Sequence, residues 1–147
     1  MTTMQRIFFA ALITATSCFA QPAPTELSTT HDGRWSVSLA CPDTRDQNGS
    51  TIKGYTYNFV VQVSGGQLEG EGKSLPPAFV HFTGKVFADG TLAISANGVS
   101  GNPEVTVGKI PRGTPYRYTM KGKLDADRGK AERVELRPCT AEFAREK

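Results

Sequence analysis

Apolar and polar residues alternate along much of the chain with a period of two, which is typical of β-strands with one buried face. In the segment 34–41 the apolar positions of this pattern are Trp35, Val37, Leu39 and Cys41. In the segment 55–64 they are Tyr55, Tyr57, Phe59, Val61 and Val63. The pattern predicts seven clear strands, at 34–41, 55–64, 67–72, 79–87, 91–97, 116–125 and 130–143.

Glycine and proline divide the chain too finely for long helices. After the first twenty residues, the longest stretch free of both is 55–64, and it is rich in aromatic and β-branched residues, which favour strands. Because glycine and proline both penalise helix interiors, the sequence indicates an all-β domain of short strands separated by turns.

One turn is specific enough to predict the pairing of its flanking strands. A two-residue turn at Asp89-Gly90 would pair Val86 with Ala93, whereas a three-residue loop ending at Gly90 pairs Val86 with Leu92. Only the longer loop keeps the apolar residues on one face, so we expect Gly90 in the left-handed conformation. The same register places His81 outside.

The strand count decides how the sheet closes. In an up-and-down meander of eight strands, the first and last strands become antiparallel neighbours, whereas seven strands would make them parallel. The short segment 104–107 is a candidate for the eighth strand, and a bulge at Arg137-Pro138 would keep 130–143 in phase as one strand. We therefore predict an antiparallel up-and-down meander closing into a lipocalin/avidin-like barrel of about eight strands.

The first twenty residues have the layout of a secretory signal peptide. Arg6 precedes an apolar run, and Ala20 ends a short stretch with small residues at the positions expected for cleavage. Lipidation at Cys18 is an alternative. The predicted organisation is a signal peptide at 1–20, a flexible tail at 21–30 and a single barrel domain at 31–147, located in the periplasm or secreted.

The composition narrows the classes of partner that this protein is expected to bind. Without Arg6 the chain has sixteen basic and fourteen acidic residues, and this mild excess argues against dedicated nucleic-acid binding. No apolar segment long enough for a transmembrane helix follows the predicted cleavage site. The outward positions Arg117, Lys121, Lys123, Lys130 and Arg133 suggest a basic stripe, which acidic neighbours dilute into a solvated face.

Two cysteines remain after cleavage, Cys41 in the first strand and Cys139 in the last. In an exported protein such a pair predicts a disulfide, and a closed barrel would place the two strands side by side. The alternative is a pair of buried free thiols. The bond would close a span of 98 residues, which is worth about 4–5 kcal/mol in the chain-entropy model.

The segment Gly33-Arg34-Trp35 at the start of the first strand resembles the Gly-x-Trp start of lipocalin-like and avidin-like barrels. That resemblance implies that a basic residue near the end of the barrel packs over Trp35, for which Arg133 and Arg137 are candidates. Over most of its length the chain also resembles small exported bacterial β-barrel proteins without an assigned activity. The segments that carry this second resemblance are 33–42, 54–57, 111–116 and 133–139.

Catalytic and metal-binding motifs are not evident, so no catalytic residue, metal ligand or cofactor is expected. The only histidines, His31 and His81, fit no metal-binding spacing, and the chain contains no Gly-x-Ser-x-Gly, P-loop or Cys-x-x-Cys motif. The sequence therefore favours a binding protein over an enzyme.

The inward aromatic residues suggest what such a protein would bind. An eight-stranded barrel is wide enough either to fill with side chains or to hold one small ligand. We predict a non-enzymatic protein that takes a small apolar or aromatic ligand, with the candidate contacts Trp35, Tyr57, Phe82, Tyr116 and Tyr118. The alternative is a protein-binding module, such as a hydrolase inhibitor that acts through its N-terminal tail or through the loop 98–115.

Overall fold

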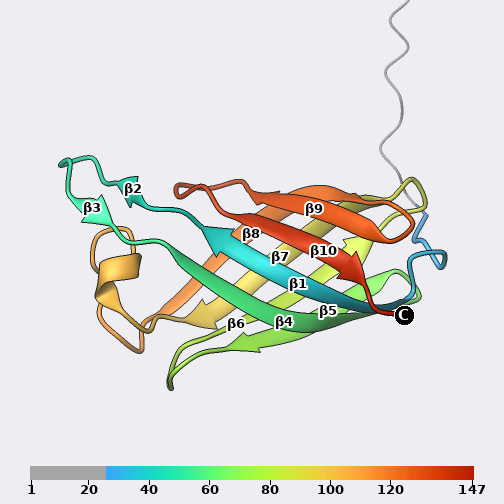
Figure 1. Cartoon of the computed structure of the whole chain (residues 1–147), viewed down its shortest axis with the longest axis horizontal. Helices are drawn as coiled ribbons and strands as arrows, with labels where there is room; N and C mark the ends of the chain where they lie inside the picture. Colours follow the sequence, from blue (N-terminus) through green and yellow to red (C-terminus); the bar gives the residue numbers. More distant parts are fainter. Residues whose placement is uncertain (1–25) are drawn as a thin grey trace, which may run out of the picture.

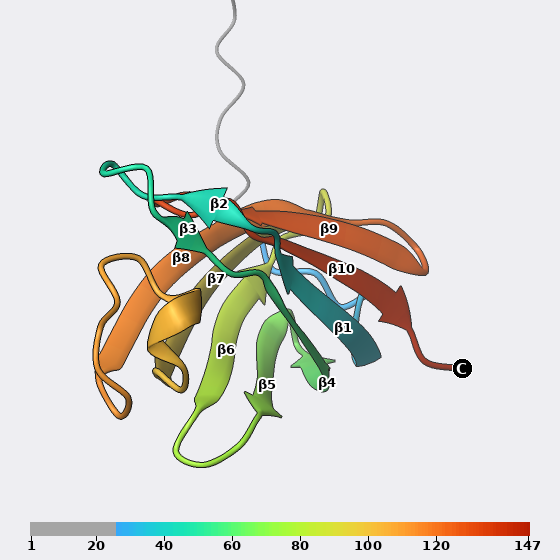
Figure 2. The ribbon, with the colours of Figure 1, turned by 60° about the vertical axis from the view of Figure 1, so that its left-hand side comes forward.

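The structure is a computed structural model in which residues 26–147 are described, and eight antiparallel strands close into a barrel (Figure 1). The barrel strands are β1 (Gly33–Cys41), β4 (Tyr55–Ser64), β5 (Gln67–Lys73), β6 (Phe79–Val86), β7 (Thr91–Val99), β8 (Pro115–Leu124), β9 (Arg128–Arg133) and β10 (Thr140–Arg145). Each pairs with the next along the chain, and β1 closes the ring by pairing with both β4 and β10. Figure 2, which brings the left-hand end of Figure 1 forward, shows the strands arranged around the ring. The predicted all-β meander barrel of eight strands is confirmed.

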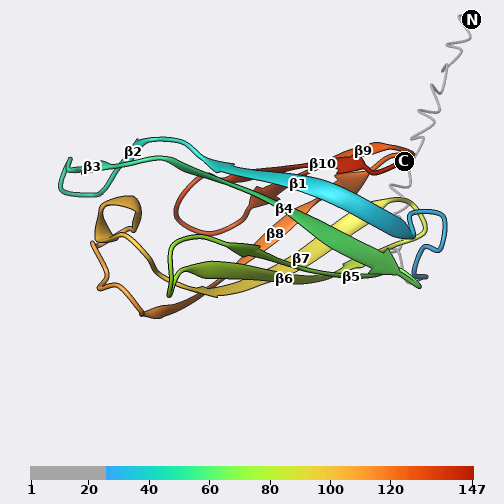
Figure 3. The same ribbon diagram turned by 60° about the horizontal axis from the view of Figure 1, so that its bottom comes forward.

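The two ends of the barrel differ in their connections. At the loop end lie the long connections 42–54, 74–78, 100–114 and 134–139. The first contains a small hairpin of β2 (Thr44–Arg45) and β3 (Thr51–Ile52), which projects beyond the barrel (Figure 3). At the opposite end, which we call the hairpin end, the strands are joined by short turns.

The eighth strand is not where the sequence pattern placed it. Residues Pro103–Val105 form a short 3₁₀ helix, η1, because the Asn102 side chain accepts a hydrogen bond from the Glu104 amide and Pro103 occupies the first turn. The eighth strand instead comes from 130–143, which is two strands, β9 and β10, joined by the loop 134–139.

The apolar alternation of 130–143 continues into the loop 134–139, but the apolar residues of this loop are exposed. Val134 and Leu136 are 55% and 83% exposed. Leu136 also has a positive φ of 53°, and Pro138 has no amide to donate to a ladder, so the strand cannot continue through this segment. The expected bulge at Arg137-Pro138 is therefore wrong.

The predicted β6–β7 register is confirmed. Val86 pairs with Leu92, Gly84 pairs with Ile94, and Gly90 has a φ of 82°. The Asp89 carboxylate accepts a hydrogen bond from the Thr91 amide, which holds the loop closed. His81 lies on the outer side of the sheet and is one-third exposed, 3.3 Å from the Glu69 carboxylate.

The barrel interior is filled with apolar side chains over most of its length. The largest of them are Trp35, Phe82, Leu39, Leu68, Leu92, Met120 and Leu124, all less than 2% exposed. At the hairpin end the Trp35 indole nitrogen donates to the His31 carbonyl, which lies in the segment leading into β1. Any ligand site inside the barrel is therefore confined to the loop end.

The predicted tail is described from Glu26 onward, and this part is packed against the barrel. Leu27 forms a bridge with Phe87, and Ser28 is buried and hydrogen-bonded to His31. The signal peptide at 1–20, the residue Cys18 and the start of the tail lie outside the described residues. Between residues 26 and 147, no helix has the length and apolarity needed to cross a membrane.

Candidate functional site

A cavity of about 470 Å³ opens at the loop end of the barrel. Its walls come from the start of β4, the loop 74–78 and the long loop between β7 and β8, including η1. The residues that line it are Tyr55, Thr56, Tyr57, Ser74, Leu75, Ala78, Val99, Ser100, Gly101, Asn102, Pro103, Val105, Thr106, Arg112 and Tyr116. Its volume is in the range of small-molecule sites.

Four tyrosines gather at this end because two strands present them at alternate, inward positions. Tyr55 and Tyr57 come from β4, and their rings meet edge to face with centroids 5.3 Å apart. Tyr116 and Tyr118 come from β8, and their rings are nearly parallel with centroids 5.9 Å apart. Tyr116 also donates to the Phe79 carbonyl, and a Cβ at Gly98 would lie only 2.5 Å from its hydroxyl oxygen. Glycine at this position therefore makes room for the Tyr116 ring.

Arg133 extends this cluster, although the sequence placed it on the outer face. It pairs with Met120, whose side chain is fully buried, so Arg133 points into the barrel rather than out of it. Its guanidinium carbon lies 4.2 Å from the centroid of the Tyr118 ring, on which it stacks. Arg133 therefore does not belong to the predicted basic stripe.

Two polar atoms in the cluster are buried without a partner. They are the Tyr118 hydroxyl and the Arg133 Nε, and the guanidinium makes neither an ion pair nor a hydrogen bond within residues 26–147. Unsatisfied buried polar groups are uncommon in folded proteins and cost stability, so they point to a partner such as water or a ligand.

Burial keeps the tyrosines of the cluster protonated. Loss of hydration raises the pKa of Tyr118 and that of Tyr116 well above the usual tyrosine value, and raises that of Tyr55 as well. The nearby Arg133 guanidinium opposes this rise in all three, so it lies within electrostatic range of each ring. At neutral pH these hydroxyls are therefore hydrogen-bond donors.

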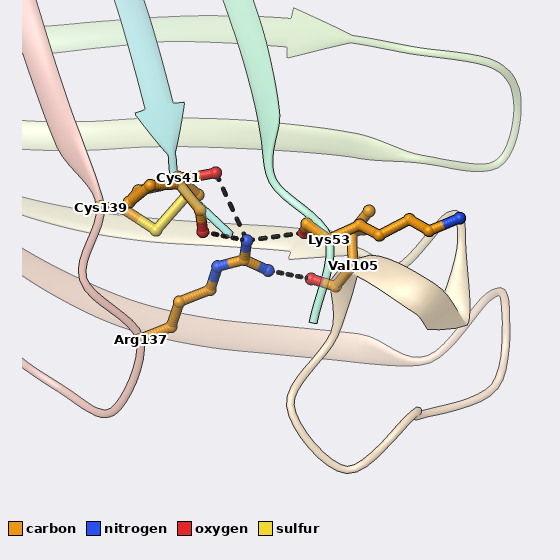
Figure 4. The surroundings of a disulfide bond; sticks show 6 residues. Cys41, Lys53, Val105, Arg137 and Cys139 are labelled. Atoms are coloured by element: carbon orange, nitrogen blue, oxygen red, sulfur yellow. Dashed lines mark hydrogen bonds between the residues drawn. A yellow bond between two sulfur atoms is a disulfide. The ribbon is translucent and has the colours of Figure 1, made fainter. Parts of the chain in front are cut away.

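A second guanidinium, that of Arg137, fixes the connections around the cavity mouth. Arg137 is 3% exposed and donates to the carbonyls of Val105 at 2.5 Å, of Pro42 and Lys53 at 2.7 Å and of Cys41 at 3.3 Å (Figure 4). It thus joins η1, the segment around β2 and β3, and the loop 134–139.

The disulfide lies beside this clamp. Cys41 ends β1, Cys139 directly precedes β10, and the two form the bond that the sequence predicted, with their Cα atoms 4.2 Å apart. The alternative of free thiols is excluded. Because three connections are held by the bond and by Arg137, the rim of the cavity is preorganised.

The structure gathers only part of the predicted ligand site. Tyr57 and Tyr116 line the cavity, and Tyr118 lies one ring further in, stacked on Tyr116. Trp35 and Phe82 are fully buried in the filled core and do not line the cavity.

Other parts of the site were missed. Tyr55 carries the same inward alternation as Tyr57 and could have been included on that signal. Arg133 is inward because it lies two residues after the buried Ala131 in β9 and so shares its face. The loop residues Leu75 and Arg112 are brought to the cavity only by the tertiary structure. Within residues 26–147, no three histidine, cysteine, aspartate or glutamate side chains lie close enough together to hold a metal ion.

A cation does pack over Trp35, but neither candidate from the sequence supplies it. Arg145 at the end of β10 lies 5.2 Å from the Trp35 ring, and its guanidinium donates to the carbonyls of Thr30 and Asp32. Arg133 and Arg137 stack instead on Tyr118 and Tyr55, at the opposite end of the barrel. Comparisons with protein-family models, with curated proteins and with solved structures find no match for this chain.

Proposed function

We propose that this protein is an exported, non-enzymatic binding protein that takes a small aromatic or apolar molecule into the cavity at the loop end. The observation that supports it best is the cavity of about 470 Å³ with Tyr55, Tyr57 and Tyr116 in its wall. Concave sites with aromatic walls and a few polar groups are the usual form of small-molecule sites. Location outside the cytoplasm, in the periplasm or the medium, is supported by the disulfide, since such bonds persist in oxidising compartments.

The rim of the cavity supports this function because it needs little ordering on binding. Arg137 and the disulfide hold three of the surrounding connections in place. A site that is already ordered loses less conformational entropy when a ligand enters, which favours affinity.

Titration with N-phenyl-1-naphthylamine, an uncharged dye whose fluorescence rises in apolar surroundings, tests the proposal. We expect saturable binding with one site per chain. Tyr57→Ala removes an aromatic wall and should weaken binding about tenfold, because an aromatic contact is worth roughly 0.5–1.5 kcal/mol beyond the area it buries.

Val60→Ala is the matched control, since Val60 lies on the same strand but is 36% exposed and lines a groove on the outer face. It should leave the affinity unchanged. Absence of saturable binding, or equal losses in the two variants, would contradict a site in the cavity.

A second candidate function is protein binding, such as inhibition of a hydrolase. It is favoured by Leu136, which is 83% exposed at the tip of a loop whose flanking residues are held by Glu135, Arg137 and Cys139. The tail and the loop 98–115 have less support, since residues 26–30 pack on the barrel and Val107 is only 37% exposed. Assays against purified serine proteases test it, and inhibition that Leu136→Asp does not change would exclude this loop as the contact.

A further inference from the structure

The guanidinium of Arg133, inside the loop end of the barrel, forms no ion pair within residues 26–147, although the Glu135 carboxylate lies within electrostatic range of it. The nearest acidic residues along the chain face outward: Glu132 pairs with Lys130 at 2.8 Å, and Glu135 accepts hydrogen bonds from Thr119. Arg137 donates from both terminal nitrogens to backbone carbonyls and leaves only its Nε without a partner, whereas the Arg133 guanidinium makes no hydrogen bond within residues 26–147. A half-buried guanidinium of this kind is a site for an anion.

A neutral donor lies against the same guanidinium. The Tyr118 side chain is 4% exposed, its hydroxyl has no partner, and its ring stacks under Arg133 at 4.2 Å. Because burial raises the pKa of Tyr118, the hydroxyl keeps its proton and can donate it to an anionic oxygen. Guanidinium and hydroxyl together supply donors for a singly charged group.

The stacked rings connect these donors to the cavity. Tyr116 lines the cavity wall and lies parallel to Tyr118, with an angle of 9° between their planes, and Arg133 covers Tyr118. Tyr55, which also lines the cavity, feels the charge of Arg133. Tyr118 and Arg133 do not themselves line the cavity, so a ligand flanked by the aromatic rings of its wall would reach these donors past Tyr116.

We propose that the ligand is a small aromatic carboxylate, whose carboxylate is bound by the Arg133 guanidinium and the Tyr118 hydroxyl while its ring packs among Tyr55, Tyr57 and Tyr116. This inference rests on the proposed function and adds the charge of the ligand to it. A carboxylate fits better than a phosphate monoester, because one guanidinium and one neutral hydroxyl match a single negative charge. Aromatic side chains favour an aromatic ring, through edge-to-face or offset contacts.

A pair of ligands that differ only in charge tests the inference. We would measure the binding of 2-naphthoate and 2-naphthamide to the mature protein at pH 7.5 by isothermal titration calorimetry. The wild type should bind the carboxylate at least about tenfold more tightly, as expected for hydrogen bonds assisted by charge. Arg133→Met should abolish this preference, because the carboxylate loses its cation.

Two further variants keep the test independent of any folding defect. Tyr118→Phe removes one hydroxyl from a ring that stays in place and should reduce the preference for the carboxylate several-fold. Lys121→Met removes a cation from an exposed position on the outer face of the same strand, and it should leave the preference unchanged.

The outcomes separate this inference from the proposed function. Binding of the amide and of N-phenyl-1-naphthylamine with no preference for the carboxylate would overturn the inference and leave the binding function standing. A preference that survives both Arg133→Met and Tyr118→Phe would also overturn it. Failure of all three probes to bind would overturn the proposed function as well.

Discussion

At the scale of single residues, Arg137 shows how a buried cation can serve structure alone. All of its hydrogen-bond acceptors are backbone carbonyls, which come from the end of β1 and from two connections, 42–54 and 100–114, that are distant from it in sequence. Backbone carbonyls carry no net charge, so the arrangement depends on the number and direction of the donors that only arginine offers.

Replacing Arg137 should therefore destabilise the protein. We expect Arg137→Met to lower the free energy of unfolding by about 2–4 kcal/mol, because four backbone carbonyls, all at least partly buried, lose a charged donor. Urea unfolding followed by the fluorescence of Trp35 measures this value. Arg128→Met, at an exposed position, is the control and should stay within about 0.5 kcal/mol of the wild type.

Tyr118 should behave in the opposite way. Its hydroxyl is buried without a partner, so we expect Tyr118→Phe to raise the free energy of unfolding by about 1 kcal/mol in the absence of ligand. Tyr116→Phe is the matched comparison, because the Tyr116 hydroxyl donates to Phe79 and its removal should lower stability. Equal effects of the two substitutions in urea unfolding would show that the Tyr118 hydroxyl has a partner after all.

The tyrosines also make stability depend on alkaline pH. Burial raises the pKa of Tyr55, Tyr116 and Tyr118 above the usual value near 10 that they regain on unfolding. Their contribution is therefore complete below pH 10 and is lost as the pH rises from there through their folded-state pKa values. The free energy of unfolding should therefore fall between pH 8 and 12. The fall should be less steep for Tyr118→Phe than for the wild type.

At the scale of elements, the β6–β7 hairpin depends on one backbone conformation. Gly90 has a φ of 82°, which residues with a side chain rarely adopt, and a Cβ there would meet the Leu124 carbonyl. We expect Gly90→Ala to cost about 1–3 kcal/mol in thermal or urea unfolding. Ala88→Ser, at an exposed position of the same loop, should have almost no effect, and equal losses in the two variants would contradict this account.

Elements that alternate strictly were predicted within a few residues of their observed ends. The strand 55–64 is the clearest example, because its aromatic and β-branched residues favour a strand locally and its pattern defines a buried face. The prediction of one continuous strand at 130–143 was wrong because Val134 and Leu136 fit the same alternation although they are exposed, which only the structure shows. The prediction of a strand at 104–107 was wrong because the helix start at Asn102 and Pro103 outweighed the β-branched residues of this segment.

At the scale of the whole molecule, the disulfide joins the two strands that close the barrel. It constrains a span of 98 residues, so its removal should lower the free energy of unfolding by about 2–5 kcal/mol. The double variant Cys41→Ala/Cys139→Ala, compared with the wild type in urea, measures the loss. Reduction of the wild type by dithiothreitol should reproduce it, whereas an unchanged midpoint in both cases would contradict a stabilising role.

The sequence by itself determined the class of the fold, the β6–β7 register and the cysteine pairing. These follow from the alternation of residues, from the demand of one turn for a left-handed residue, and from closure, which makes the first and last strands neighbours. All three are local properties or direct consequences of strand order.

Only the tertiary structure decided how much of the barrel interior is filled and which residues line the cavity. Whether a barrel is filled or hollow depends on how side chains from all eight strands share one volume, which no single segment encodes. The walls that Leu75 and Arg112 add to the cavity depend on how the loops fold back over the end of the barrel. For the same reason Trp35 and Phe82 belong to the core, although their pattern is the same as that of Tyr57.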